Sequence, residues 1–533
     1  MKKKDELNQK KEFLPFVILF ILMIIYLTAL NDYFALDGDD VTYSLLAKSI
    51  VKGKGYVDLR IPFNPPHIAY PPGFPLLLTI PTILAPDKVS VLKLIPVLCT
   101  IIGLLFFYKY LRLKFRKTFA YIIFILVCIN PVIFYFSNKI LTQAPFFCAL
   151  AIAVYFYEKF ITKNETRLFS KEFIFFTLAA VSSWYFRKEG LFVFLSILFS
   201  LILNKKFKNG LIFALIFILF VTPWILRNNY VQKNALPVVK EHILQKVSVL
   251  RMFATTDLYN EDMPNATLSE IIKRFFEYSK MYFGYFIPVE TFGMKFLENS
   301  VIAIIGIPFF LITGLIVSLN IREKGNLKIL FKSIRPIHLY FIFGIFLVLL
   351  THALSTKYLH PIVPFIVLFF ILGIEKIANL ISKKIFSKIL FYFILFIFFL
   401  FSISETQRLY SEERNYSYAS SDPVFAHYIE IAKWFKKNMP KEIKILTRKG
   451  EFFYWYSGCP GYSHPNTMNA EKILKFINDL EFDYVLLTET GFDYRTRRYI
   501  DNAIANYPQF FELVWEWNVP NIQKKAILLK VEK

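Results

Sequence analysis

The chain has 533 residues, of which 56% are hydrophobic and 61 are phenylalanine, while charged residues make up 19%. An ordinary soluble protein carries about 25% charged residues, so this composition excludes an ordinary soluble enzyme, a disordered chain and a fibrous protein. The net charge is +23, which in a membrane protein first indicates basic loops retained in the cytoplasm rather than nucleic-acid binding. Three cysteines lie in apolar runs and Cys459 stands alone, so we expect neither a disulfide framework nor a thiolate metal site.

Eleven apolar runs approach the length of about 20 residues that a helix needs to cross a bilayer. They are 13–30, 90–108, 119–137, 144–160, 172–187, 189–204, 210–227, 299–319, 337–355, 358–375 and 387–403. The first run exceeds the apolar core of about 7 to 15 residues found in signal peptides, so we do not expect it to be cleaved. The sequence therefore predicts a mainly α, polytopic membrane bundle of roughly 11 to 13 spans over residues 1–403.

Lysine and arginine alternate from one connection to the next, and basic connections stay in the cytoplasm. The basic segments are 2–11, 109–117, 205–208, 322–335 and 383–388. The remaining segments then face outward: a first outer loop at 31–89, links near 138–143 and 355–358, a turn at 187–189, a large outer loop at 228–298, and everything after about residue 404. This pattern predicts the cytoplasmic (inner) membrane as the location, with a cytoplasmic N-terminus.

The segment from Tyr70 to Pro86 is apolar but contains five prolines, which break helical hydrogen bonding. We expect an interfacial or re-entrant element there. Counting it as a twelfth span would put the basic 109–117 segment outside, against the charge pattern.

Residues 404–533 are rich in polar residues and contain no run long enough to span a membrane. Helical periodicity predicts a helix at 424–440, and a second helix is expected near 469–480. Short apolar runs predict strands at 443–447, 483–488 and 525–531. This region is predicted to be a small soluble extracytoplasmic α/β domain. It contains no glycine-rich loop of the kind that cradles phosphate.

Three carboxylates, Asp37, Asp39 and Asp40, follow the first apolar run and are predicted to face outward. One explanation is a solvated acidic cap on the next helix, because aspartate is favoured at a helix start. The other is a general base or cation ligand, since like charges placed together raise one pKa toward a useful value.

Basic residues also lie on the predicted outer side, where the positive-inside tendency disfavours them. They are Arg187, Lys188, Arg227 and Lys357. A single such cation often reaches toward lipid phosphates, but four beside a carboxylate cluster suit a substrate that carries a phosphate. His360 is a candidate proton carrier or phosphate donor, although a lone histidine is more often structural. Glu189 is expected to pair with its neighbours and fix their geometry.

Five motifs support a more specific interpretation. They are DDVTY at 39–43, PPGFPLLL at 71–78, RKEG at 187–190, PWILRN at 223–228 and KYLHPIVP at 357–364. With these motifs the chain resembles the GT-C superfamily of polytopic glycosyltransferases, especially the branch of the protein O-mannosyltransferases and the lipid A aminoarabinose transferases. The likeness spans most of the membrane domain, and DDVTY is its most specific part.

The chain departs from that pattern at several positions. Lys357 replaces the usual arginine, and Thr142-Gln143 replaces the usual Ser-Glu, which removes a carboxylate. The acidic pair is Asp-Asp rather than Asp-Glu, and Asp37 is an additional acid. A divalent cation therefore stays open as a cofactor, and no metal ligand is assigned.

The resemblance implies a GT-C bundle that transfers a hexose or pentose from undecaprenyl or dolichyl phosphate to a lipid, glycan or protein acceptor. In that mechanism Asp39 is the general base and Asp40 supports it, while the outer cations and His360 neutralise the departing phosphate. Tyr43, Tyr70 and Tyr358 would line the path of the sugar or carrier, or pack as interfacial aromatics.

Three other functions remain open. A transporter or flippase of lipid-linked sugars would place its charged groups nearer the middle of the membrane, often in repeated halves, and no internal repeat is found. A polymerase or ligase of lipid-linked glycans would use similar lipids but does not account for DDVTY and YPPGFP. A catalytically inactive scaffold would be consistent with the missing carboxylate at Gln143.

Overall fold

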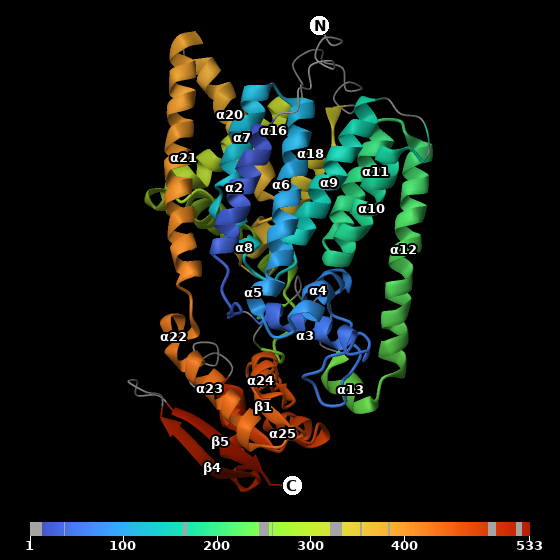
Figure 1. The fold of residues 1–533 in the computed structure, drawn as a ribbon, viewed down its shortest axis with the longest axis vertical. Helices are drawn as coiled ribbons and strands as arrows, with labels where there is room; N and C mark the ends of the chain where they lie inside the picture. The colour runs from blue at the N-terminus through green and yellow to red at the C-terminus, as the bar shows by residue number, and fades with distance from the viewer. Residues whose placement is uncertain are drawn as a thin grey trace.

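The computed structural model describes residues 13–36, 38–163, 167, 169–244, 255–257, 260–319, 333–351, 354–381, 384–488, 497–518 and 525–532. A long helical bundle occupies most of the molecule, and a small α/β domain lies at one end of it (Figure 1). Asp37, one of the three predicted outer carboxylates, lies outside the described residues.

A helix lies on each of the eleven predicted runs. These helices are α2 (Leu14–Thr28), α6 (Leu94–Lys114), α7 (Lys117–Cys128) with α8 (Pro131–Ser137), α9 (Gln143–Thr162), α10 (Lys171–Phe186), α11 (Gly190–Leu203), α12 (Phe207–Asn234), α16 (Ile307–Ser318), α18 (Pro336–Leu350), α20 (Val363–Ile381) and α21 (Lys384–Arg414). By length and composition, five helices among the described residues can each cross a membrane, or six if α7 and α8, bent by 54°, form one span. The other apolar helices are shorter, so the predicted 11 to 13 spans include elements below the usual spanning length.

The bend between α7 and α8 has a local cause. Pro131 cannot donate a backbone hydrogen bond, and the side chain of Asn130 accepts from the amides of Val132 and Ile133, which starts a new helix there. Elsewhere glycine allows close packing: a Cβ on Gly314 of α16 would lie 1.7 Å from the carbonyl oxygen of Phe369 in α20. A side chain at this position would therefore clash with α20, and small residues of this kind let membrane helices pack closely.

The first outer loop forms short helices at the end of the bundle nearest the α/β domain (Figure 1). They are α3 (Asp39–Val51), α4 (Gly73–Leu84) and α5 (Val89–Leu92). The proline-rich 70–86 segment forms the 12-residue helix α4, which contains Pro81 and packs against α3. This helix is shorter than a spanning helix, in accordance with the expectation that the segment is not a twelfth span.

Much of the predicted large outer loop is helical. Helix α12 continues to Asn234 and is followed by α13 (Pro237–His242), α15 (Leu268–Met281), a π-helix η2 (Tyr282–Thr291) and the short elements η3 (Lys295–Leu297) and η4 (Ile302–Gly306). Helix α15 begins with a capping box, in which Thr267 and Glu270 satisfy each other's backbone amides.

The C-terminal domain contains the predicted strands and helices. Its elements are α22 (Tyr418–Ser421), α23 (Pro423–Asn438), β1 (Ile445–Thr447), α24 (Gly450–Ser457), β2 (Gly461–Tyr462), α25 (Ala470–Asp479), β3 (Tyr484–Leu487), α26 (Arg497–Asn506), η6 (Pro508–Phe510), β4 (Phe511–Asn518) and β5 (Lys525–Val531). The sheet has the order β2-β1-β3-β5-β4; β1 is parallel to β2 and β3, while β5 is antiparallel to β3 and β4. The predicted domain boundary at 404 falls inside α21, which continues to Arg414.

The C-terminal domain contacts both outer loops of the bundle. Arg60 of the first outer loop forms an ion pair of 3.0 Å with Glu451 on α24. In the large outer loop, His242 on α13 lies 2.7 Å from a carboxylate oxygen of Asp479 on α25. The domain is therefore joined to the same end of the bundle at two separate places.

Candidate active site

Asp39 is the first residue of α3 and its carboxylate is accessible. Gly38 precedes it with a φ of 92°, a conformation that favours glycine. The hydroxyl of Tyr70 donates to Oδ1 of Asp39 at 2.9 Å, and Nζ of Lys357 lies 3.7 Å from Oδ2. The side chain of Asp39 is 35% exposed. One oxygen is thus held by a hydrogen bond, while the carboxylate remains open to an incoming group.

Asp40 has a different environment from its neighbour. It is 1% exposed, and its carboxylate accepts from the backbone amides of Ala35 at 2.5 Å and Val41 at 2.9 Å. Burial raises the pKa of Asp40 from 3.8 to about 7, against the opposing effect of these two amides and of Lys93 and Lys139. Asp40 therefore fastens the turn that leads into α3.

The raised pKa of Asp40 predicts a pH-dependent stability. The pKa of Asp40 in the folded protein, about 7, exceeds the ordinary value of 3.8. Protonated Asp40 therefore contributes fully to the free energy of unfolding below about pH 4, and this contribution is lost as the pH rises through 7. We expect the thermal unfolding midpoint of Asp40→Asn, relative to that of the wild type, to increase between pH 4 and pH 7. Thermal unfolding of both proteins in lipid nanodiscs checks this, and a difference that does not vary with pH would contradict it.

Tyr43 and Tyr70 pack beside Asp39. Their rings lie 4.8 Å apart, and the ring of Tyr43 also contacts Phe74 at 5.3 Å. The negative charge of Asp39, together with burial, raises the pKa of Tyr70 well above 10. Tyr70 therefore stays protonated and acts as a hydrogen-bond donor to Asp39.

The turn between α10 and α11 places a second charged group nearby. Arg187 forms an ion pair of 2.5 Å with Glu189 and donates to the hydroxyl of Thr142 at 3.1 Å. Its guanidinium lies 5.8 Å from the ring of Tyr358. Arg187, Glu189 and Tyr358 line one small cavity. Because Tyr358 directly follows Lys357, which pairs with Asp39, this turn lies near Asp39. Lys188 is in the same turn, and burial lowers its pKa.

Arg227 and His360 make other contacts. Arg227 donates to the backbone carbonyls of His67 and of Tyr56, and therefore ties α12 to the first outer loop. His360 is fully buried against the rings of Phe136 and Phe147, and neither ring nitrogen has a hydrogen-bond partner among the described residues.

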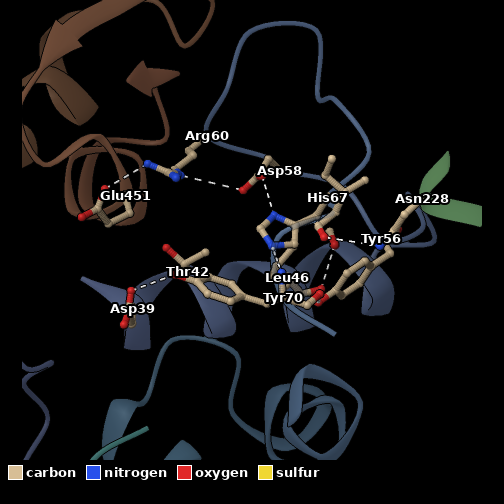
Figure 2. A network of polar contacts seen from close by, with 12 residues as sticks. Asp39, Thr42, Leu46, Tyr56, Asp58, Arg60, His67, Tyr70, Asn228 and Glu451 are labelled. Carbon is tan, nitrogen blue, oxygen red and sulfur yellow. Dashed lines mark hydrogen bonds and ion pairs between the residues drawn. The ribbon is translucent and has the colours of Figure 1, made fainter. Parts of the chain in front are cut away.

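Several polar residues around the site have no counterpart in the sequence predictions. Figure 2 shows them as a connected network that reaches from Glu451 through Arg60, Asp58 and His67 to Tyr70. The only sequence signal is weak: one histidine lies three residues before Tyr70 in the first outer loop. Nothing in the sequence indicates that Glu451, in another domain, belongs to the same network.

The described residues do not form a metal site at Asp39. Within the described ranges, one group of three side chains lies close enough to share a metal ion: Glu241, His242 and Asp479. Lys475 already forms ion pairs with Glu241 and with Asp479. Near the site, Gln143 is 2% exposed, and its side-chain oxygen has no partner in the described part of the chain. Among the residues that the structure describes, the side chains that contact the Asp39 carboxylate are those of Lys357 and Tyr70 and not further carboxylates.

The comparisons with known proteins agree with this architecture. Residues 69–226 match the family described as dolichyl-phosphate-mannose-protein mannosyltransferase. This range includes Tyr70, Arg187 and Glu189, whereas Asp39 and Lys357 lie outside it. No curated protein matches the chain in sequence.

Solved structures match over almost the whole chain. ArnT from Cupriavidus metallidurans, bound to undecaprenyl phosphate, is 9% identical, with a TM-score of 0.59 over 96% of this chain and 97% of that protein. The apo oligosaccharyltransferase from Archaeoglobus fulgidus is 11% identical, with a TM-score of 0.59 over 96% of this chain and 74% of that protein. The chain is a multi-pass membrane protein with the fold of GT-C glycosyltransferases, and the resemblance carried by its motifs is confirmed.

Proposed function

We propose that this protein is an inverting glycosyltransferase that moves a sugar from a polyprenyl-phosphate donor to an acceptor at the outer face of the cytoplasmic membrane. The observation that carries the proposal is the accessible carboxylate of Asp39, oriented by Tyr70 and faced by Lys357. Helix α3, which begins at Asp39, lies at the end of the GT-C bundle where the C-terminal domain docks (Figure 1). A solvent-accessible carboxylate and a cation in one place suit acid–base chemistry on a phosphate-linked substrate.

In the proposed reaction, Asp39 removes the proton from a hydroxyl group of the acceptor. The resulting oxygen attacks the anomeric carbon, the bond between that carbon and the phosphate oxygen breaks, and the configuration inverts. The bonding electrons leave with the lipid phosphate, which therefore gains negative charge in the transition state. Cations held in fixed positions stabilise that charge.

Lys357, Arg187 and Lys188 are the cations proposed for this role. Lys357 already faces the base, and Arg187 is held by Glu189 and Thr142 with its guanidinium beside Tyr358. The proposed donor class gains support from ArnT, whose structure holds undecaprenyl phosphate. The contacts of Arg227 and His360 favour supporting roles, in which they hold the first outer loop and the aromatic core.

The test is sugar transfer by the full-length protein, purified and reconstituted in lipid nanodiscs. Radiolabelled polyprenyl-phosphate hexoses and pentoses serve as donors, and lipid, glycan and protein fractions of membranes serve as acceptors. Transfer of the labelled sugar from the donor lipid to an acceptor is measured with and without EDTA. We expect turnover of at least one donor, and the EDTA arm measures whether that turnover needs a divalent cation. Binding of donors without any turnover would contradict the proposal and favour a transporter or an inactive scaffold.

A further inference from the structure

We propose that Glu451, Asp58 and His67 are positioning residues, which act from the C-terminal domain and the first outer loop to hold Tyr70 and, through it, the carboxylate of Asp39. The inference rests on the proposed function only in naming Asp39 as the base. The chain of contacts that carries it is shown in Figure 2.

The first link joins the C-terminal domain to the start of α3. Glu451 on α24 pairs with Arg60 at 3.0 Å, and the two side chains are 11% and 16% exposed. Glu451 also packs directly on Gly38, where an added Cβ would lie 2.2 Å from Oε1 of Glu451. Helix α24 therefore packs against Gly38, the residue that immediately precedes Asp39.

The second link runs through Asp58 and His67. Oδ1 of Asp58 lies 3.8 Å from Nε of Arg60, and Oδ2 of Asp58 lies 2.7 Å from Nδ1 of His67. Nε2 of His67 accepts from the backbone amide of Tyr70 at 3.0 Å. Because Nε2 is the acceptor, Nδ1 carries the proton and donates to Asp58, which fixes a single tautomer.

His67 cannot reach a substrate itself. It is 6% exposed, and its ring is stacked on Tyr70 at 5.3 Å and meets the ring of Tyr56 edge-on at 5.6 Å. Both of its ring nitrogens are already engaged. Its effect on the reaction therefore passes through the position of Tyr70.

The third link is Tyr70, which is held at three points. Its amide donates to His67, its carbonyl accepts from the hydroxyl of Tyr56 at 3.0 Å, and its own hydroxyl donates to Asp39 at 2.9 Å. Without the bond to His67, the backbone of Tyr70 loses one of these restraints. The Asp39 carboxylate then loses its fixed orientation toward the acceptor.

Turnover is the first readout. With the donor found in the transfer assay, we expect His67→Ala to lower kcat by roughly 10- to 100-fold with little change in the donor KM, because misplaced groups slow the reaction rather than weaken binding. His67→Gln should recover part of this loss, since its side-chain oxygen can still accept from Tyr70. Glu451→Gln should also lower kcat.

The control breaks a similar contact elsewhere. His242→Ala removes another pairing of a histidine with an aspartate between the bundle and the C-terminal domain, the 2.7 Å contact with Asp479. We expect this variant to keep the wild-type kcat. Equal losses in His67→Ala and His242→Ala, or full activity in His67→Ala while Asp39→Asn is inactive, would overturn the inference and leave the proposed function standing.

A second readout does not depend on turnover. With 3-fluorotyrosine incorporated at position 70 of the full-length protein, the fluorine resonance reports the surroundings of that ring. We expect it to shift in Asp39→Asn, His67→Ala and Glu451→Gln, and to stay in place in His242→Ala. A resonance unmoved by His67→Ala and Glu451→Gln would overturn the inference even if no donor is turned over.

Discussion

Asp39→Asn is expected to lower turnover by roughly 100- to 10,000-fold, the range that a positioned general base contributes. Asparagine has the same shape, and its side-chain oxygen can still accept the hydrogen bond that Tyr70 now donates to Oδ1. It cannot take up a proton, so the chemical step is lost while the site keeps its geometry. The measurement is kcat with the donor of the transfer assay, together with donor affinity, which should change little.

Asp40→Asn is the matched control, because it makes the same chemical change one residue away. Asp40 is 1% exposed and bonded to two backbone amides. Its replacement should therefore cost stability more than catalysis. An inactive Asp40→Asn beside an active Asp39→Asn would exchange the roles assigned to the two residues.

Glu413→Gln is expected to destabilise the protein by about 3 to 5 kcal/mol, the usual cost of breaking a buried ion pair by removing one partner. Oε1 of Glu413, near the end of α21, lies 2.5 Å from Nζ of Lys139, and the two side chains are 6% and 5% exposed. The variant leaves the ammonium of Lys139 buried without its counter-charge. Chemical denaturation in mixed micelles measures the change in the free energy of unfolding.

Two further variants test whether the unpaired charge of Lys139 causes this loss of stability. The double variant Lys139→Met with Glu413→Gln removes both charges and should recover much of the stability, because no unpaired charge remains. Glu430→Gln breaks the exposed pair with Lys433 and should have little effect. A loss in the double variant as large as in Glu413→Gln would show that the pairing of charges is not what stabilises this junction.

Much of the fold is predictable from the sequence because its signals are local. Apolar length predicts helices such as α9 and α20, and short apolar runs predict β3 and β5. The structure brings Asp39, Tyr70 and Lys357 together, and it brings Arg187 and Glu189 to a nearby turn.

The different surroundings of Asp39 and Asp40 could not be predicted. Consecutive residues on a helix point about 100° apart, and only the packing of the whole loop decides which one is buried. The contact between Arg60 and Glu451 joins residues almost 400 positions apart, and no local pattern encodes it. The end of α21 at Arg414 was also missed, because helix boundaries are weakly marked by composition.

The contact between Arg60 and Glu451 also affects the order in which the molecule is completed during synthesis. The ribosome makes Asp39 and Tyr70 early, but Glu451 and Gly461, whose amide donates to the carbonyl of Arg60, come near the end of the chain. At about 5 to 20 residues per second, the first outer loop is made well before these partners. A nascent or truncated chain therefore carries Asp39 without the residues that hold it, and the network around Asp39 becomes complete only once the α/β domain of residues 404–533 has folded.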